Sequence, residues 1–183
     1  MVFLSRSWLV RTAGPYSKLS YTSDMEIQDK ELHRIAITCI IYNEEGKYLL
    51  TKRSPTKKAH PNKWTVPGGG LNVDDYVRRP QTHGDAGWYG SVEEALHREV
   101  KEEVNIVIGK ATYLLDLTFI RPDGIPVLVL SYYAPYVSGE VILDEDAVEY
   151  QWASLAEAKE LDLISGIYEE LEEVEKLLRK DRN

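Results

Sequence analysis

The sequence contains little of what would mark a secreted, nucleic-acid-binding or membrane protein. Cysteine occurs once among 183 residues, as Cys39, so the chain cannot form an internal disulfide, and we expect it in a reducing compartment, the cytoplasm. Basic residues are not in excess, and the net charge of −8 argues against a general nucleic-acid binder. An anionic substrate is compatible with this charge only if metal ions or a few well-placed Lys and Arg residues supply local positive charge.

Long apolar runs are also missing. The opening stretch MVFLSRSWLV is apolar but is interrupted by Arg6, and it is too short to span a membrane. No clean signal-peptide core or cleavage pattern follows it, so no membrane association is expected. A hydrophobic content of 43% and a charged content of 28% are typical of a globular protein with a core, and the length fits one domain with extensions.

Hydrophobic patterning and turn residues predict a mixed α/β domain. Residues 1–33 show no clear period and are interpreted as an N-terminal extension to a domain over 34–183. Strands are expected at 34–42, 47–53, 64–70 (where a short strand runs into a turn), 111–120, 125–136 and 148–154, and helices at 91–104, 155–161 and about 166–180. Hairpin turns between strands favour a sheet that is mixed and largely antiparallel. The intervening residues 71–90 are expected to form a long loop.

The segment 91–104 carries the clearest helical signal. Ser91 is a good N-cap, and Glu94 three residues later completes a capping box. Apolar residues recur every four positions along one side of the expected helix: Val92, Leu96, Val100 and Val104. This stripe predicts a helix that packs one face on the core.

Three carboxylates share a face of this expected helix. Glu99, Glu102 and Glu103 have i, i+3, i+4 spacing, and Arg98 precedes them. Grouped carboxylates repel one another unless cations are near, and Mg²⁺ prefers hard oxygen ligands of this kind. The pattern is therefore either a solvated acidic face or a metal site. The Glu-rich run YEELEEVEK near the C-terminus is interpreted as solvated surface.

The surroundings of these carboxylates resemble a known signature. The stretch GSVEEALHREVKEEVNI, preceded by WTVPGGG, resembles the Nudix box, in which G, five residues, E and seven residues precede R-E-U-x-E-E-x-G-U, where U is aliphatic. Residues 98–103 match its central part without exception, Ile106 matches the final aliphatic position, and 67–69 match the usual lead-in. The resemblance covers roughly two-thirds of the chain, about 34–152, and implies a Nudix-type α/β/α sandwich.

Three departures from the signature are visible. Gly90 stands where the family has a glutamate, and Asn105, which also tolerates left-handed backbone, stands where it has a glycine. The separation of Gly69 from Arg98 exceeds the family's by fifteen residues, so an insertion lies within about 71–90 and is expected to shape the substrate pocket. Three acidic residues of the insertion are candidates to replace the missing glutamate: Asp74, Asp75 and Asp85.

The resemblance implies an enzyme that hydrolyses a diphosphate linkage in a nucleoside diphosphate linked to another moiety, X, with Mg²⁺ or Mn²⁺ as cofactor. It implies that Glu99 and Glu103 are metal ligands, that Glu102 is a further ligand or a water-mediated contact, and that Arg98 orients the glutamates.

Two further parts of the site are expected from the same resemblance. The backbone carbonyl of Gly68 is one, because the turn brings it toward the helix. The other is an acidic residue of the run LDEDAVEYQW, where Asp146 or Glu145 is preferred to Glu149, which enters a strand.

Substrate contacts are sought among basic and aromatic residues. Candidate phosphate ligands are Arg53, Lys57, Lys58 and Lys63. Arg53 is preferred because it ends a strand that faces the glycine turn. Trp88 and Tyr89 in the insertion are candidate stacking surfaces, with simple packing of the loop as the alternative. The layout favours a nucleoside di- or triphosphate, while nucleotide sugars, ADP-ribose and dinucleotides stay open.

Two other functions are compatible with the sequence. A Nudix-fold sensor would bind a nucleotide without cleaving it, and Gly90 keeps this open. The stretch KRSPTKKAHPNKW resembles isopentenyl-diphosphate isomerases, but those have a cysteine where this chain has 67–69, and Cys39 is distant in sequence. The histidines show no zinc-type pairing. A homodimer through the N-terminal extension or the C-terminal helix is an open expectation.

Overall fold

The computed structural model describes residues 32–82 and 87–180. The strands are β1 Arg34–Tyr42, β2 Tyr48–Arg53, β3 Trp64–Thr65, β4 Gly68–Gly70, β5 Val107–Ile108, β6 Thr112–Ile120, β7 Pro126–Ser138 and β8 Ala147–Ala153. The helices are η1 Val73–Asp75, α1 Ser91–Val104, α2 Leu155–Ala158 and α3 Ile167–Lys180. Nearly all of the predicted N-terminal extension, 1–33, lies outside the described residues, as does Asp85.

Strand β1 lies at the centre of the sheet. It runs parallel to β7 from Arg34 to Tyr42, and it pairs antiparallel with β4 along its first half and with β2 at its end. β2 also pairs with β3 and β8, and β7 with β5 and β6, all antiparallel. Within 32–82 and 87–180, β1 with β7 is the only parallel pair of strands. The prediction of a mixed, largely antiparallel sheet is confirmed.

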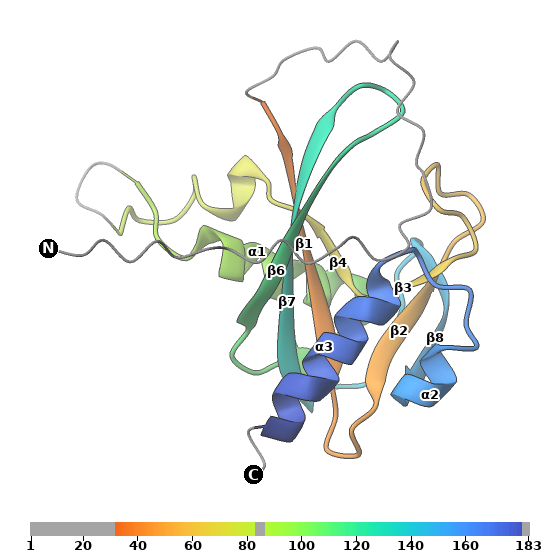
Figure 1. Cartoon of the computed structure of the whole chain (residues 1–183). Helices are drawn as coiled ribbons and strands as arrows, with labels where there is room; N and C mark the ends of the chain where they lie inside the picture. The colour runs from red at the N-terminus through yellow and green to blue at the C-terminus, as the bar shows by residue number, and fades with distance from the viewer. Residues whose placement is uncertain (1–31, 83–86, 181–183) are drawn as a thin grey trace, which may run out of the picture.

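Helices α1 and α3 cover opposite faces of this sheet (Figure 1). Side chains alternate along a strand, so Ile37 and Cys39 of β1 belong to the buried cluster that includes α1, and Ile40 belongs to the one that includes α3. The predicted stripe of α1 is buried at Leu96, Val100 and Val104. The predicted α/β/α sandwich is confirmed.

The start of α1 differs from the prediction. Its N-cap is Gly90, with φ 75° and ψ 10°, and Ser91 is the first helical residue, with no side-chain cap bond. The left-handed backbone of Gly90 starts the helix one residue earlier, because glycine has no Cβ that opposes this conformation. At the other end Asn105 takes φ 58°, the left-handed conformation that the sequence allowed.

The segment 64–70 also departs from the prediction, because its glycines do not form a simple turn. Gly68–Gly70 are strand β4, whose partners in β1 are Ala36, Ile37 and Thr38. The glycine run is therefore held along the edge of β1, next to α1. This placement positions the candidate site.

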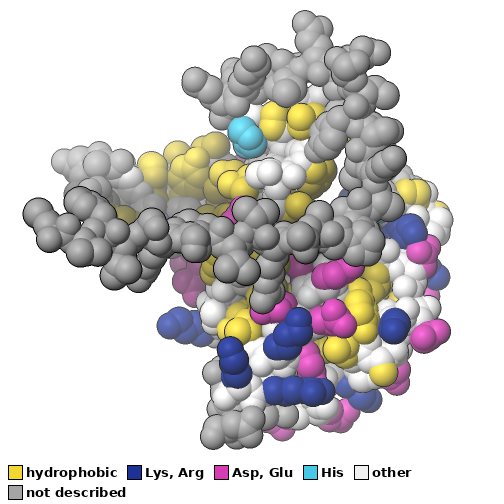
Figure 2. Space-filling view, viewed as in Figure 1, with side chains coloured by type: hydrophobic (Ala, Val, Ile, Leu, Met, Phe, Trp, Pro, Cys, Tyr) yellow, Lys and Arg dark blue, Asp and Glu magenta, His cyan; other side chains and the backbone are white. Residues whose placement is uncertain are grey.

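The surface that carries α3 shows acidic and basic side chains side by side rather than a patch of one sign (Figure 2). Glu173 and Lys176 pair within α3, as do Glu175 and Arg179. The interpretation of the run YEELEEVEK as solvated surface agrees with the exposure of Glu169 and Glu173. It is wrong for Glu170, whose Oε2 is buried, and Glu175 also accepts a hydrogen bond from the Tyr48 hydroxyl of β2 at 2.6 Å. In the described part of the chain no helix has the length and apolarity needed to cross a membrane.

Candidate active site

The site forms where the glycine strand β4 meets helix α1. A Cβ on Gly69 would lie 2.2 Å from the carboxyl carbon of Glu99, and a Cβ on Gly68 would lie 2.2 Å from the backbone oxygen of Ile37. Gly68 also has φ 154°. Only residues without a Cβ allow β4 to fit between β1 and α1 at this distance, which explains the glycines at 68 and 69.

Two of the predicted glutamates bond to this strand. The amide of Gly70 donates to Oε1 of Glu99 at 3.0 Å, and the amide of Gly68 donates to Oε2 of Glu103 at 2.9 Å. One helical turn separates the two glutamates, and amides of alternate residues in a strand point the same way, so the two spacings match. The structure thus brings together Glu99, Glu103 and Gly68 through the Gly68 amide, while a role for the Gly68 carbonyl stays a prediction.

Arg98 joins the helix, the glycine strand and the insertion. Its Nη1 lies 3.0 Å from Glu99 Oε1 and 2.8 Å from Glu102 Oε2, and its Nη2 donates to the Gly70 carbonyl at 3.1 Å. Its Nε lies 2.5 Å from Oδ1 of Asp75. Glu102 is otherwise exposed, so its link to the site runs through Arg98.

Glu103 is the buried carboxylate of the site. Its pKa is raised to about 7, chiefly by burial and then by the nearby charges of Asp144, Glu99 and Asp146, while the bond from the Gly68 amide opposes the rise. Carboxylates are therefore concentrated around Glu103, and Arg98 and Lys57 offset only part of their charge by pairing with Glu99 and Asp146. This is the electrostatic condition that a cation would relieve.

Asp144 is a site residue that sequence reasoning missed. Its backbone amide donates to the Glu103 carbonyl at 3.2 Å, and Ile142 donates to the Val104 carbonyl at the same distance. These bonds to the end of α1 bring Asp144 and Asp146 toward Glu103 and leave Glu145 exposed. The acidic run was visible in the sequence. The backbone path that turns residues 144 and 146, but not 145, toward Glu103 was not visible. Of the two preferred candidates, the structure brings Asp146 near Glu103.

The predicted basic residues have different surroundings. Lys57 forms an ion pair with Asp146, which places its ammonium beside the acidic cluster. Arg53, the last residue of β2, donates from Nε to the Ala59 carbonyl at 2.9 Å, in the loop that follows the strand. Lys63 pairs with Asp162, and Lys58 is exposed.

The predicted aromatic candidates belong to the insertion. The ring of Trp88 lies 5.2 Å from that of Tyr76, and its Nε1 donates to the Arg79 carbonyl at 2.9 Å. Packing of the inserted segment, the alternative raised for Trp88, accounts for these contacts. Tyr89 is 65% exposed.

Comparison with known proteins agrees with this fold. The NUDIX domain family model matches residues 32–174, more than half of the chain, and the chain belongs to this family. The assignment confirms the family suggested by residues 98–103, and Nudix hydrolase homologues act on phosphoric anhydride bonds, as predicted.

Three curated relatives show how broad the similarity is. The chain is 39% identical over 123 residues to the NAD-capped RNA hydrolase NudC of Pseudomonas aeruginosa, covering 67% of this chain and 37% of that protein. It is 31% identical over 133 residues to an isopentenyl-diphosphate Delta-isomerase of Klebsiella pneumoniae, covering 70% and 64%. It is 28% identical over 137 residues to the nucleoside triphosphatase NudI of Klebsiella pneumoniae, covering 69% and 86%. The chain thus spans well under half the length of NudC.

Solved structures share the fold. A MutT NUDIX hydrolase from Burkholderia pseudomallei superposes with a TM-score of 0.62 at 25% identity, covering 79% of this chain and 99% of that one. The NUDIX domain of Shewanella oneidensis NrtR, solved with ADP ribose, gives 0.62 at 16% identity, covering 81% and 90%.

Nudix hydrolases generally need divalent metal ions. Among the described residues, no three Asp, Glu, His or Cys side chains converge tightly enough to hold an ion as they stand. The donor chemistry nevertheless fits, because Glu99 and Glu103 supply hard oxygens one turn apart and other carboxylates lie near the buried Glu103. Mg²⁺ keeps several waters and needs only one or two carboxylates from the protein.

Proposed function

We propose that this chain hydrolyses a diphosphate linkage in a nucleoside diphosphate linked to another moiety, with Mg²⁺ as the ion and Mn²⁺ as a substitute. The observation that carries the proposal is the buried carboxylate of Glu103, fixed by the Gly68 amide one turn from Glu99 and surrounded by like charge. A merely solvated helix face would leave these carboxylates exposed, and Glu99 is only 12% exposed.

In the proposed reaction a water oxygen forms a bond to one phosphorus of the diphosphate, and the bridging oxygen leaves with the other phosphate. A bound divalent ion would neutralise charge on the phosphate oxygens and make the water more acidic. Glu99 and Glu103 would hold this ion. Asp144 and Asp146 stand close enough to Glu103 for the positive charge of the ion to act on them as well. The proton released by the water would pass to one of these carboxylates.

The protein's own cations would bind the substrate from one side of the acidic cluster. Lys57 is the best placed, because its partner Asp146 is itself near Glu103. A phosphate group would compete with Asp146 for the Lys57 ammonium. Arg53, Lys58, Trp88 and Tyr89 stay candidates for weaker contacts with the phosphate or the base.

The test is hydrolysis by the purified chain, with Mg²⁺, of nucleoside triphosphates, nucleotide sugars, ADP-ribose, NAD and dinucleoside polyphosphates. We expect turnover of one substrate class, with nucleoside di- and triphosphates favoured. Glu103→Gln should lose this activity. Glu173→Gln, an exposed glutamate of α3, is the matched control and should keep it. The chelator EDTA should abolish turnover, and added Mg²⁺ should restore it.

A non-catalytic nucleotide sensor is the second candidate. The similarity to a NUDIX domain solved with ADP ribose favours testing it. If no substrate is turned over but ADP-ribose or another nucleotide raises Tm, the hydrolase proposal fails and the sensor proposal replaces it.

The isomerase function is less well supported, even though one relative bears that name. Cys39 lies beside the glycine strand in space, because its amide donates to the Pro67 carbonyl at 2.9 Å. Its thiol is fully buried, and burial raises its pKa to about 12. A substrate at the acidic cluster would not reach it.

A further inference from the structure

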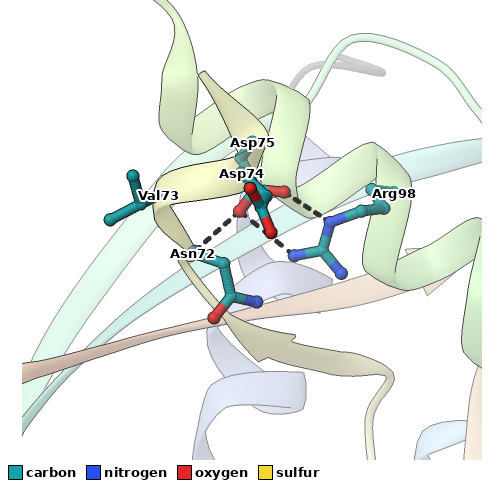
Figure 3. A pocket seen from close by; sticks show the side chains of 5 residues that line it. All are labelled: Asn72, Val73, Asp74, Asp75 and Arg98. Atoms are coloured by element: carbon teal, nitrogen blue, oxygen red, sulfur yellow. Dashed lines mark hydrogen bonds and ion pairs between the residues drawn. The ribbon is translucent and has the colours of Figure 1, made fainter. Parts of the chain in front are cut away.

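The insertion contributes one buried carboxylate to the site. Oδ1 of Asp75 lies 2.5 Å from Nε of Arg98, and Oδ2 lies 3.2 Å from Nη2 (Figure 3). The Asp75 side chain is 3% exposed, and its bond with Arg98 lowers its pKa below the usual range. The neighbouring Asp74 is 72% exposed and pairs with Arg78 instead. Of the candidates that the sequence offered, the described structure therefore selects Asp75.

Asp75 is itself held in place. The backbone amide of Asn72 donates to its Oδ2 at 2.7 Å. The start of the short helix η1 therefore fixes the direction in which the carboxylate faces Arg98. The insertion is also fastened to α1 by the ion pair of Arg79 with Glu94, at 3.1 Å. A hollow of about 400 Å³ opens beside this contact, lined by Asn72, Val73, Asp74, Asp75 and Arg98.

The shape of the Arg98 side chain lets its contact with Asp75 affect the glutamates of α1. A guanidinium is planar and rigid, so fixing Nε and Nη2 on one carboxylate also fixes the direction of Nη1. Nη1 is the atom that bonds Glu99 and Glu102. Gly90, where the Nudix signature has a glutamate, supplies no carboxylate.

We propose that Asp75 is a positioning residue: it holds Arg98, which in turn aims Glu99 and Glu102, so that the insertion supplies the carboxylate missing at Gly90. The inference rests on the proposed function for its link to catalysis. It does not rest on it for its link to metal binding, which can be measured without a substrate.

The experiment measures Mn²⁺ binding by calorimetry, and kcat and KM on the best substrate, in the whole chain. Asp75→Asn removes the charge and keeps the size. We expect Mn²⁺ affinity and kcat to fall by about 10–100-fold, the range seen when groups that orient metal ligands are removed, with KM for substrate nearly unchanged. Asp74→Asn, the exposed neighbour, should change each by less than about twofold. Asp75→Glu keeps the charge and should recover part of the loss, and it serves as the test if Asp75→Asn does not fold.

The outcomes separate the two proposals. If no substrate is turned over by the wild-type chain but Asp75→Asn weakens Mn²⁺ binding and Asp74→Asn does not, the hydrolase function fails and the positioning role stands. If Asp75→Asn lowers Tm and leaves Mn²⁺ affinity and kcat at wild-type values, Asp75 is only structural and the inference is overturned. Absence of Mn²⁺ binding by the wild-type chain overturns both proposals.

Discussion

Helices α1 and α3 are each 14 residues long, carry five glutamates each and bury an apolar stripe on opposite faces of the sheet. On α3 the carboxylates of Glu173 and Glu175 meet lysine and arginine of their own helix. On α1 the carboxylates of Glu99 and Glu103 meet strand amides, and Arg98 links them to the insertion. Helices of similar composition thus place their carboxylates in different surroundings. The cause is that α1 packs beside a strand of glycines, whose amides are close enough to donate hydrogen bonds to its glutamates.

The largest difference between the helices should appear in activity. Glu99→Gln keeps the shape of the side chain but removes the charge that Arg98 and the Gly70 amide stabilise. We expect kcat/KM to fall by at least about 100-fold, more than for loss of an orienting group. Glu169→Gln, its exposed counterpart on α3, should stay within about twofold of wild type. Equal losses in the two variants would show that α1 has no special role.

The next effect tests whether the glycine strand makes the difference. In Gly68→Ala the new methyl carbon would lie 2.2 Å from the Ile37 oxygen, in a backbone conformation with φ 154° that alanine rarely adopts. We expect a loss of roughly 2–5 kcal/mol in the free energy of unfolding, measured by urea denaturation. Gly46→Ala is the control, since φ is 74° there but nothing lies within 4 Å, and it should lose only about 1 kcal/mol. Similar losses at both positions would mean that close packing at Gly68 is unimportant.

A smaller effect concerns Glu170, a carboxylate of α3 that, like Glu99 and Glu103 of α1, lies against the sheet. Glu170 packs toward the sheet, where burial raises its pKa and a hydrogen bond with Ser131 opposes the rise. Its Oε2 is buried without a hydrogen-bond partner among the described residues. A raised pKa in the folded state means that this carboxyl disfavours folding increasingly as the pH rises through the shifted range.

Glu170→Met should therefore raise the free energy of unfolding by about 1 kcal/mol at pH 8 and by less at pH 4, where the wild-type carboxyl is protonated. Glu173→Met, at an exposed position, is the control and should show no such pH dependence. Denaturation at the two pH values decides this. A gain that is the same at both would mean that the charge of Glu170 is not the cause.

The smallest effect is expected at the surface of α3. Lys176→Ala breaks an exposed ion pair with Glu173, 3.2 Å long. Such pairs contribute little because solvent and salt screen them, so the free energy of unfolding should change by less than about 0.5 kcal/mol. Thermal denaturation at low and high salt measures it. A change above 1 kcal/mol would show that the charges of α3 also form a structural network.

Much of the fold followed from local patterns. Strand β1 lies where a run of β-branched and aliphatic residues predicted it, and helices α1 and α3 lie where apolar residues recur with a helical period. The N-cap of α1 was misassigned because Gly90 adopts the left-handed cap, which serine's capping preference does not reveal. The glycine segment was expected to be a turn because local signals cannot show that β1 is available as its partner.

The sequence by itself determined the family, the acidic face of α1 and the lack of a glutamate at Gly90, because these depend on residue type and spacing along the chain. Only the tertiary structure decided that Asp75 meets Arg98 across 23 positions, that Asp144 rather than Glu145 lies near Glu103, and that Lys57 faces Asp146. Each of these contacts joins segments that are far apart in the sequence. Their distance in space is set by how the sheet, the loops and α1 pack together, and no local preference of the chain encodes that spatial distance.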